Sequence, residues 1–193
     1  MDYPLKYPTV SEIIENHDRV IDESGGMHGI RDLDGLTGVI EFIQNDFYYP
    51  DLKEKLIHLI FSINKNHYFF DGNKRASIAS GAIFLLKNGV NPSYVRWYIE
   101  QFEDIVVWLA ENSIDKRGID LAISCMFIRF MMLDKYLLPK THREAKGKIR
   151  KILVNHKKSV EFDEKIKAGY FGSIAYYYAV IVERTFKDMK VYH

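Results

Sequence analysis

The stretch from His67 to Arg75 brings together side chains that could do chemistry. His67 is of the type best matched to accepting a proton near neutral pH, and Asp71 supplies the kind of carboxylate that binds Mg²⁺ beside phosphates. Asn73, Lys74 and Arg75 add hydrogen-bond donors and two positive charges. A base, a metal carboxylate and a phosphate cradle are the parts of a nucleotide-dependent transfer to a hydroxyl group. Each residue alone is more often structural, so the prediction depends on their joint occurrence.

The local pattern places these residues where a loop meets a helix. A helix that opens at Pro50-Asp51 runs out near Asn66, and a new helix begins at Asn73 or Lys74. The start of a helix presents unpaired backbone N–H groups and the positive end of the macrodipole. Gly72 lets the backbone approach a ligand closely. The junction is therefore expected to bind an anion such as a phosphate.

Apolar residues recur at helical spacing almost throughout the chain, which predicts an all-α fold. The short segment from Gly26 to Asp34 is expected to be a small hairpin or a loop. The helix after Gly72 is expected to be central, because its small residues let neighbouring helices come close. Its predicted buried side is Ala76, Ala79, Ile83 and Leu86, and further helices are expected over 11–23, from Asp34, from Asn91-Pro92, over 115–136 and over 173–189.

The composition is that of a globular protein with no bulk preference for polyanions. Hydrophobic residues make up 47% and charged residues 27% of the 193 residues, and the net charge is +1. The one cysteine, Cys125, excludes a disulfide within the chain and fits a reducing compartment. No signal peptide pattern opens the chain and no apolar run is long enough for a bilayer, so we expect no membrane association and a cytoplasmic location.

One segment departs from this even charge distribution. Residues 138–158 contain eight Lys or Arg and a single acid, Glu144. The segment predicts either a solvated helix face or a patch for RNA or another acidic partner. We favour the solvated face, because no aromatic stacking platform interleaves the charges.

The string His67-x-Phe69-x-Asp71-Gly72-Asn73-Lys74-Arg75 resembles the signature of the Fic/Doc superfamily, and closely that of its death-on-curing branch. The similarity extends to His17-Asp18-Arg19, Gly25-Gly26, residues 29–32 and residues 84–89. It implies a Fic-type helical bundle with a small β-hairpin flap. The resemblance covers roughly residues 9–110, so we expect a catalytic core over residues 1–112. A helical C-terminal extension over 113–193 would follow, either packed on the core as one domain or forming a separate lobe.

The resemblance implies a role for each motif residue. His67 would be the general base that deprotonates a target hydroxyl, and Asp71 would hold Mg²⁺. Phe69 would anchor the loop in the core. Gly72 and Asn73 would shape the anion hole, while Arg75 would clamp nucleotide phosphates. A flap made of Gly26, Met27, His28, Gly29 and Ile30 would register the target chain by strand addition.

Lys74 bears on the choice of reaction. Adenylylating members of the family carry Gly at this position, whereas death-on-curing members carry Lys and transfer the terminal phosphate of the nucleotide. Physically, Lys74 adds bulk and charge where a phosphate would otherwise lie. Ala76 departs from the Thr that death-on-curing proteins often have, which removes a hydroxyl group but leaves the main donors intact. The resemblance thus implies phosphorylation of a Ser or Thr hydroxyl on a protein, with ATP and Mg²⁺ as cofactors.

By the same resemblance, the protein would be the toxin of a toxin–antitoxin pair that acts on translation. An antitoxin would be one partner, and elongation factor Tu would be the target. Two alternatives stay open. The same site could transfer AMP or another nucleotidyl group, or the fold could be a non-catalytic nucleotide-binding regulatory or interaction module. The intact His67, Asp71, Asn73 and Arg75 argue against the second alternative.

A further match concerns regulation. The segment from Ser11 to Asn16 fits the inhibitory pattern Ser/Thr-x-x-x-Glu-Gly/Asn of the family. In regulated members this Glu reaches an active-site Arg and blocks productive nucleotide binding, which makes Ser11 and Glu15 candidates for self-inhibition. Because the match falls inside the first core helix, we favour the alternative that Glu15 is simply solvated.

Overall fold

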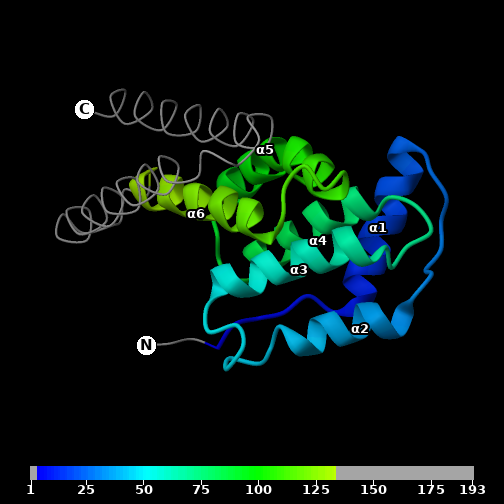
Figure 1. Cartoon of the computed structure of the whole chain (residues 1–193), viewed down its shortest axis with the longest axis horizontal. Coiled ribbons are helices and arrows are strands. Elements are labelled where there is room, and N and C mark those ends of the chain that lie inside the picture. Colours follow the sequence, from blue (N-terminus) through cyan, green and yellow to red (C-terminus); the bar gives the residue numbers. More distant parts are fainter. Residues whose placement is uncertain (1–3, 134–193) are drawn as a thin grey trace. The chain divides into compact units, whose positions relative to one another are not determined.

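The structure, a computed structural model of the chain, describes residues 4–133. The basic segment 138–158 and the helix expected over 173–189 lie outside the described residues. Six helices and no strand of a sheet occur in the part described, which confirms the all-α prediction (Figure 1). They are α1 (Val10–Ser24), α2 (Leu33–Phe42), α3 (Leu52–Asn66), α4 (Asn73–Lys87), α5 (Pro92–Ala110) and α6 (Lys116–Leu133).

The chain divides into two compact units, and the first, Met1–Asp120, contains every residue of the predicted catalytic motif. Helix α6 runs from this unit into the second. Among the described residues, no helix has both the length and the apolar character needed to cross a bilayer. The predicted division at residue 112 stays a prediction.

Local sequence signals set the ends of the helices. Thr9 begins α1 with a capping box, in which its hydroxyl accepts from the Glu12 N–H and the Glu12 carboxylate accepts from the Thr9 N–H. The Asp51 carboxylate caps α3 by accepting from Glu54 N–H at 2.9 Å. Helix α2 begins earlier than predicted, because Asp32 rather than Asp34 is its cap. The short polar side chain at each cap satisfies an N–H that has no partner within the helix.

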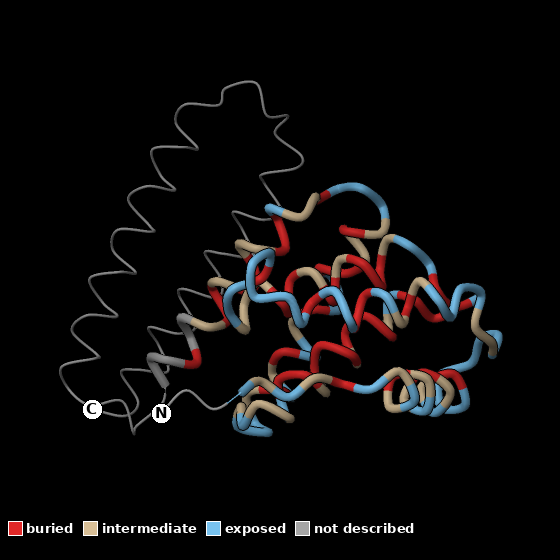
Figure 2. Tube along the Cα trace, turned by 90° about the horizontal axis from the view of Figure 1, so that it is seen from below, coloured by how far each residue is buried: buried red, intermediate tan, exposed pale blue. Residues whose placement is uncertain are grey.

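Helix α4 is central, as predicted, and packs against α1, α3 and α5 (Figure 1). Gly81 permits the close approach to α5, since a Cβ there would overlap the Tyr98 hydroxyl group. Figure 2 shows buried stretches along the inner faces of the helices. The predicted buried side of α4 is partly wrong. Ala76 is buried, but Ala79 and Ile83 are half-buried, Leu86 is exposed, and these last three line a cavity.

The predicted β-hairpin is absent from the described residues. Between α1 and α2 the chain is irregular, and its one bridge joins Ile30 antiparallel to Phe69 in the loop before α4. Gly25, Gly26 and Gly29 all have φ between 79° and 134°, which is incompatible with continuous strand pairing. The segment 25–31, which we call the flap segment, therefore pairs with the loop between α3 and α4 rather than with itself. We call that loop, residues 67–72, the catalytic loop, after the role predicted for it.

A half-buried histidine on α3, His58, makes the stability of the fold depend on pH. Burial, followed by the nearby charge of Lys116, lowers the pKa of His58 from 6.5 to about 4. Its ring lies 3.0 Å from the Tyr49 hydroxyl and 3.2 Å from the Ser62 hydroxyl. His58 thus remains neutral in the folded chain at pH values where the unfolded chain already binds a proton.

We expect the free energy of unfolding to fall as the pH is lowered from 6.5 toward 4, because the unfolded state then binds more protons. The contribution of His58 is about 1–3 kcal/mol, allowing for the part of the ring that water reaches. Urea unfolding of the wild type and of His58→Gln at several pH values measures it. The substitution should flatten the curve in this window, and an unchanged slope would contradict the assignment.

Candidate active site

The loop between α3 and α4 is built around one buried ring and one buried amide. Phe69 has 0% exposure and stacks on the His17 ring with centroids 3.9 Å apart. The Asn73 side chain accepts from Phe69 N–H and donates to the Phe69 carbonyl, both at 2.9 Å. These two bonds let the Asn73 amide shape the loop, and they leave its second N–H unused at the edge of the cavity that Asn73 also lines.

His67 ends α3 in the left-handed conformation, with φ 54° and ψ 57°. Its side chain is exposed and lines the cavity beside α4. Within residues 4–133, no hydrogen bond or ion pair engages the imidazole ring. The ring is therefore free to accept a proton from a molecule in the cavity.

Asp71 is held in its ionised form by the surrounding backbone. Its carboxylate accepts from Gly72 N–H at 2.6 Å and from Met27 N–H at 3.3 Å. These two bonds, with Arg75 adding a smaller effect, keep the pKa of the Asp71 carboxyl below its usual range. The side chain is 50% exposed, so the carboxylate can reach a ligand.

His17 braces the loop from α1, a contact that sequence reasoning did not find. Its Nε2 lies 3.0 Å from the Asp71 carbonyl, and its Nδ1 lies 3.0 Å from the Asp18 carboxylate. Gly72 must be glycine here, because φ is 71° and a Cβ would lie 3.2 Å from His17 Nε2.

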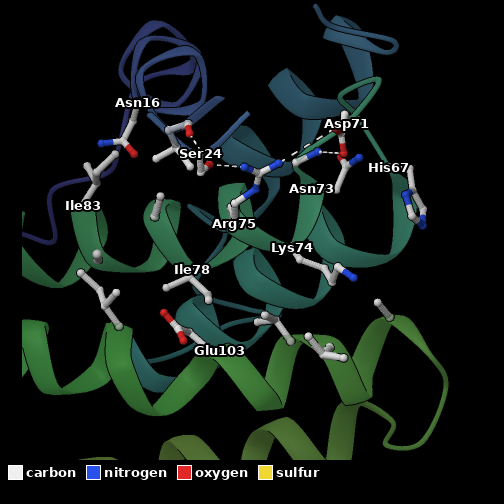
Figure 3. A pocket seen from close by; sticks show the side chains of 18 of the residues that line it. Asn16, Ser24, His67, Asp71, Asn73, Lys74, Arg75, Ile78, Ile83 and Glu103 are labelled. Atoms are coloured by element: carbon white, nitrogen blue, oxygen red, sulfur yellow. Dashed lines mark hydrogen bonds and ion pairs between the residues drawn. The ribbon is translucent and has the colours of Figure 1, made fainter. Parts of the chain in front are cut away.

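The start of α4 has the features of an anion site. The backbone N–H groups of its first turn have no partner within the helix. Because no side chain caps them in the described structure, they can bind an anion. Lys74 is exposed and faces the cavity. Arg75 donates to the Ser24 hydroxyl and, at 2.8 Å, to the Gly25 carbonyl, so the C-terminal end of α1 holds its guanidinium group (Figure 3).

These groups line one end of a cavity of about 820 Å³ between α1, α4 and α5. In Figure 3, His67 and Lys74 lie at one end, and Asn16 and Ile83 lie at the other. The remainder is mainly apolar and is formed by Ile78, Ala79, Ala82 and Leu86 of α4 and by Ile99, Val106, Val107 and Ala110 of α5. The cavity thus joins a cationic end to an apolar trough, as suits a phosphorylated molecule with an apolar ring system.

The donor set fits Mg²⁺ bound together with phosphate. Asp71 supplies one ionised, accessible carboxylate beside the start of α4. Among the described residues, no group of three or more His, Cys, Asp or Glu could hold a metal ion by protein ligands alone. Mg²⁺ commonly takes one or two carboxylates and completes its coordination with phosphate oxygens and water.

The flap segment lies against Asp71 and α1. Besides the bond from Met27 to Asp71, His28 binds two carboxylates of α1, Asp22 at 2.9 Å and Asp18 at 3.3 Å. Gly26 lies so close to the site that a Cβ would be 2.6 Å from Asp71 Oδ2. All five predicted flap residues thus lie in a segment that borders the catalytic loop.

The pKa of His28 is expected to lie above 6.5, chiefly through its hydrogen bond to Asp18. The anchoring of the flap segment by His28 is then present below pH 6.5 and is lost as the pH rises through the raised pKa. NMR titration of the His28 ring measures this value. In Asp18→Asn the pKa should move down toward 6.5, and no movement would contradict the contact.

The two candidate inhibitory residues, Ser11 and Glu15, do not line the cavity. Ser11 is exposed and lies 3.1 Å from the Thr9 hydroxyl, and Glu15 is exposed on α1 without lining the cavity. The α1 residues that do line it are Asn16, Val20 and Ser24, spaced four apart. Their four-residue spacing, which places them on one face of a helix, can be read from the sequence. No sequence pattern pointed to Glu103, an acid on α5 that also lines the cavity.

Comparison with known proteins identifies the family of the chain. The model of the Fic/DOC family matches residues 7–85, which include the flap segment and the whole catalytic motif. The chain belongs to the Fic/DOC family. It is 30% identical over 89 residues to the protein kinase doc of Escherichia phage P1, and the match covers 45% of this chain and 71% of that protein.

Proposed function

We propose that this protein transfers the terminal phosphoryl group of ATP to a Ser or Thr hydroxyl of a target protein. One observation carries the proposal. The unpartnered imidazole of His67 lines the same cavity as the uncapped start of α4 and the cationic side chains of Lys74 and Arg75. A base and a phosphate site in one cavity are what phosphoryl transfer to a hydroxyl requires.

Each residue of the site has a separate role in the proposed reaction. The target hydroxyl gives its proton to the His67 imidazole while its oxygen attacks the terminal phosphorus. The bond from that phosphorus to the bridging oxygen breaks, and ADP leaves. The first-turn N–H groups of α4, with Lys74 and Arg75, stabilise the negative charge on the phosphates. Mg²⁺ held by Asp71 would neutralise part of the same charge.

Two findings favour phosphoryl over nucleotidyl transfer. Lys74 lines the cavity with a charged side chain at the position where adenylylating members of the family have no side chain. The similar phage protein is named a protein kinase. By this kinship we also propose that the protein acts in the cytoplasm as the toxin of a toxin–antitoxin pair. An antitoxin protein would restrain it, and elongation factor Tu would be its target.

Labelled ATP tests the proposal. The purified chain is incubated with Mg²⁺, elongation factor Tu or a cell extract, and ATP labelled at either the γ- or the α-phosphorus. Label carried onto protein only from the γ position supports the proposal. Label from the α position alone would reject it in favour of nucleotidyl transfer. No transfer from either would favour a non-catalytic nucleotide-binding module.

A further inference from the structure

We infer that Arg31, a residue of the flap segment, is a positioning residue that sets the direction of the His67 imidazole. The inference rests on the proposed function, in which His67 is the base. The Arg31 guanidinium donates to the His67 carbonyl and, at 3.4 Å, to the Asn66 carbonyl. These are the last carbonyls of α3, which have no acceptor role within the helix.

The backbone at His67 needs such support. A left-handed conformation is uncommon for a residue with a side chain and costs about 1 kcal/mol or more. No described residue binds the imidazole itself, so among these contacts only those of the backbone, which sets the direction of the Cα–Cβ bond, restrain where the ring can lie. A guanidinium that bridges two successive carbonyls at this point restrains that backbone directly.

Backbone hydrogen bonds hold the main chain at Arg31 in place. Its N–H donates to the Tyr68 carbonyl at 2.7 Å, and the Asp32 N–H donates to the same oxygen at 3.1 Å. The Asp32 carboxylate also caps α2 by accepting from Gly35 N–H at 2.8 Å. Arg31 therefore ties the end of α3 to the start of α2, and it does so at the residue that carries the base.

The phosphate site is restrained by different contacts. The start of α4 is fixed by the two bonds between Asn73 and Phe69 and by the bond from Arg75 to the end of α1. Loss of the Arg31 side chain is expected to disturb His67 while leaving the phosphate site in place. This separation distinguishes a positioning residue from one that only stabilises the fold.

Kinetics on the full chain test this role. In Arg31→Ala we expect kcat to fall about 10- to 100-fold, because small misplacements of a reacting group have effects of this size. The KM for ATP should stay within about 2-fold of the wild type, since the phosphate site is held by other contacts. Arg31→Lys should keep more of kcat than Arg31→Ala, because an ammonium group can still reach one carbonyl. Arg19→Ala, at an exposed arginine of α1, is the matched control and should be unchanged.

A readout independent of turnover is the NMR signal of the His67 ring, assigned by its loss in His67→Ala. In Arg31→Ala this signal should shift while that of His58 does not. A shift without transfer activity in the wild type would leave the positioning role standing and reject the proposed function. The inference would be overturned by an unmoved His67 signal, by kcat within 2-fold of the wild type, by a lysine variant no better than the alanine variant, or by equal losses of kcat and ATP affinity.

Discussion

His67→Ala is expected to lower the rate of phosphoryl transfer by about 10²- to 10⁴-fold, the usual effect of removing a general base. The imidazole is accessible, lines the cavity and has no partner among the described residues, so it is available to act as the base. Single-turnover transfer of γ-label with saturating ATP measures the change.

The control for His67→Ala is nucleotide binding by the same variant. The phosphate contacts come from the start of α4, so the affinity for Mg²⁺ and ATP should stay within about 2-fold of the wild type. Calorimetric titration measures this affinity. Transfer at near wild-type rate would mean that His67 is not the base. Loss of transfer together with loss of nucleotide binding would mean that the residue has a structural role instead.

Asn73→Ala is expected to lower the free energy of unfolding by about 2–4 kcal/mol and to abolish activity. The substitution leaves both the N–H and the carbonyl of Phe69 without their side-chain partner in a buried place, and each unpaired group costs about 1–3 kcal/mol. The loop between His67 and α4 is then no longer held in the conformation that places the site residues, so activity is lost. Urea unfolding and the transfer assay measure the two effects.

A second substitution and a matched control sharpen this test. Asn73→Asp keeps the acceptor for Phe69 N–H but loses the donor to the carbonyl, so its effect should be intermediate. Asn66→Ala removes a single part-buried hydrogen bond, from the Asn66 amide to the Tyr68 hydroxyl, and should cost about 1 kcal/mol. Equal stability of all three variants would mean that the amide of Asn73 does not hold the loop.

The local structure around the predicted catalytic motif was predictable because its signals are local. The end of α3 at Asn66, the glycine at position 72 and the start of α4 at Asn73 follow from neighbouring residues, and the structure has all three. The capping of α1 by Thr9 is of the same kind. Contacts between distant segments gave no such signal. The bond of His17 to Asp71 and that of Arg75 to Gly25 depend on how α1 packs on α4.

Two expectations failed for physical reasons. Helical spacing identified Ala79, Ile83 and Leu86 as core residues of α4, yet they line the cavity. An apolar face packed on a neighbour and one that borders a ligand cavity have the same periodicity, so spacing cannot separate them. The hairpin that the resemblance implied at Gly26 to Ile30 is a loop, the alternative that the local pattern also allowed. Its glycines have positive φ values, and the segment makes a single bridge to Phe69.

A crystal structure of the chain with Mg²⁺ and an ATP analogue that cannot be hydrolysed tests the central claim most directly. The account predicts that the phosphates lie against the first-turn N–H groups of α4, with the ion on Asp71 and the terminal phosphorus nearest to the His67 ring. A nucleotide bound outside this cavity, or one whose α-phosphorus lies nearest to His67, would contradict it.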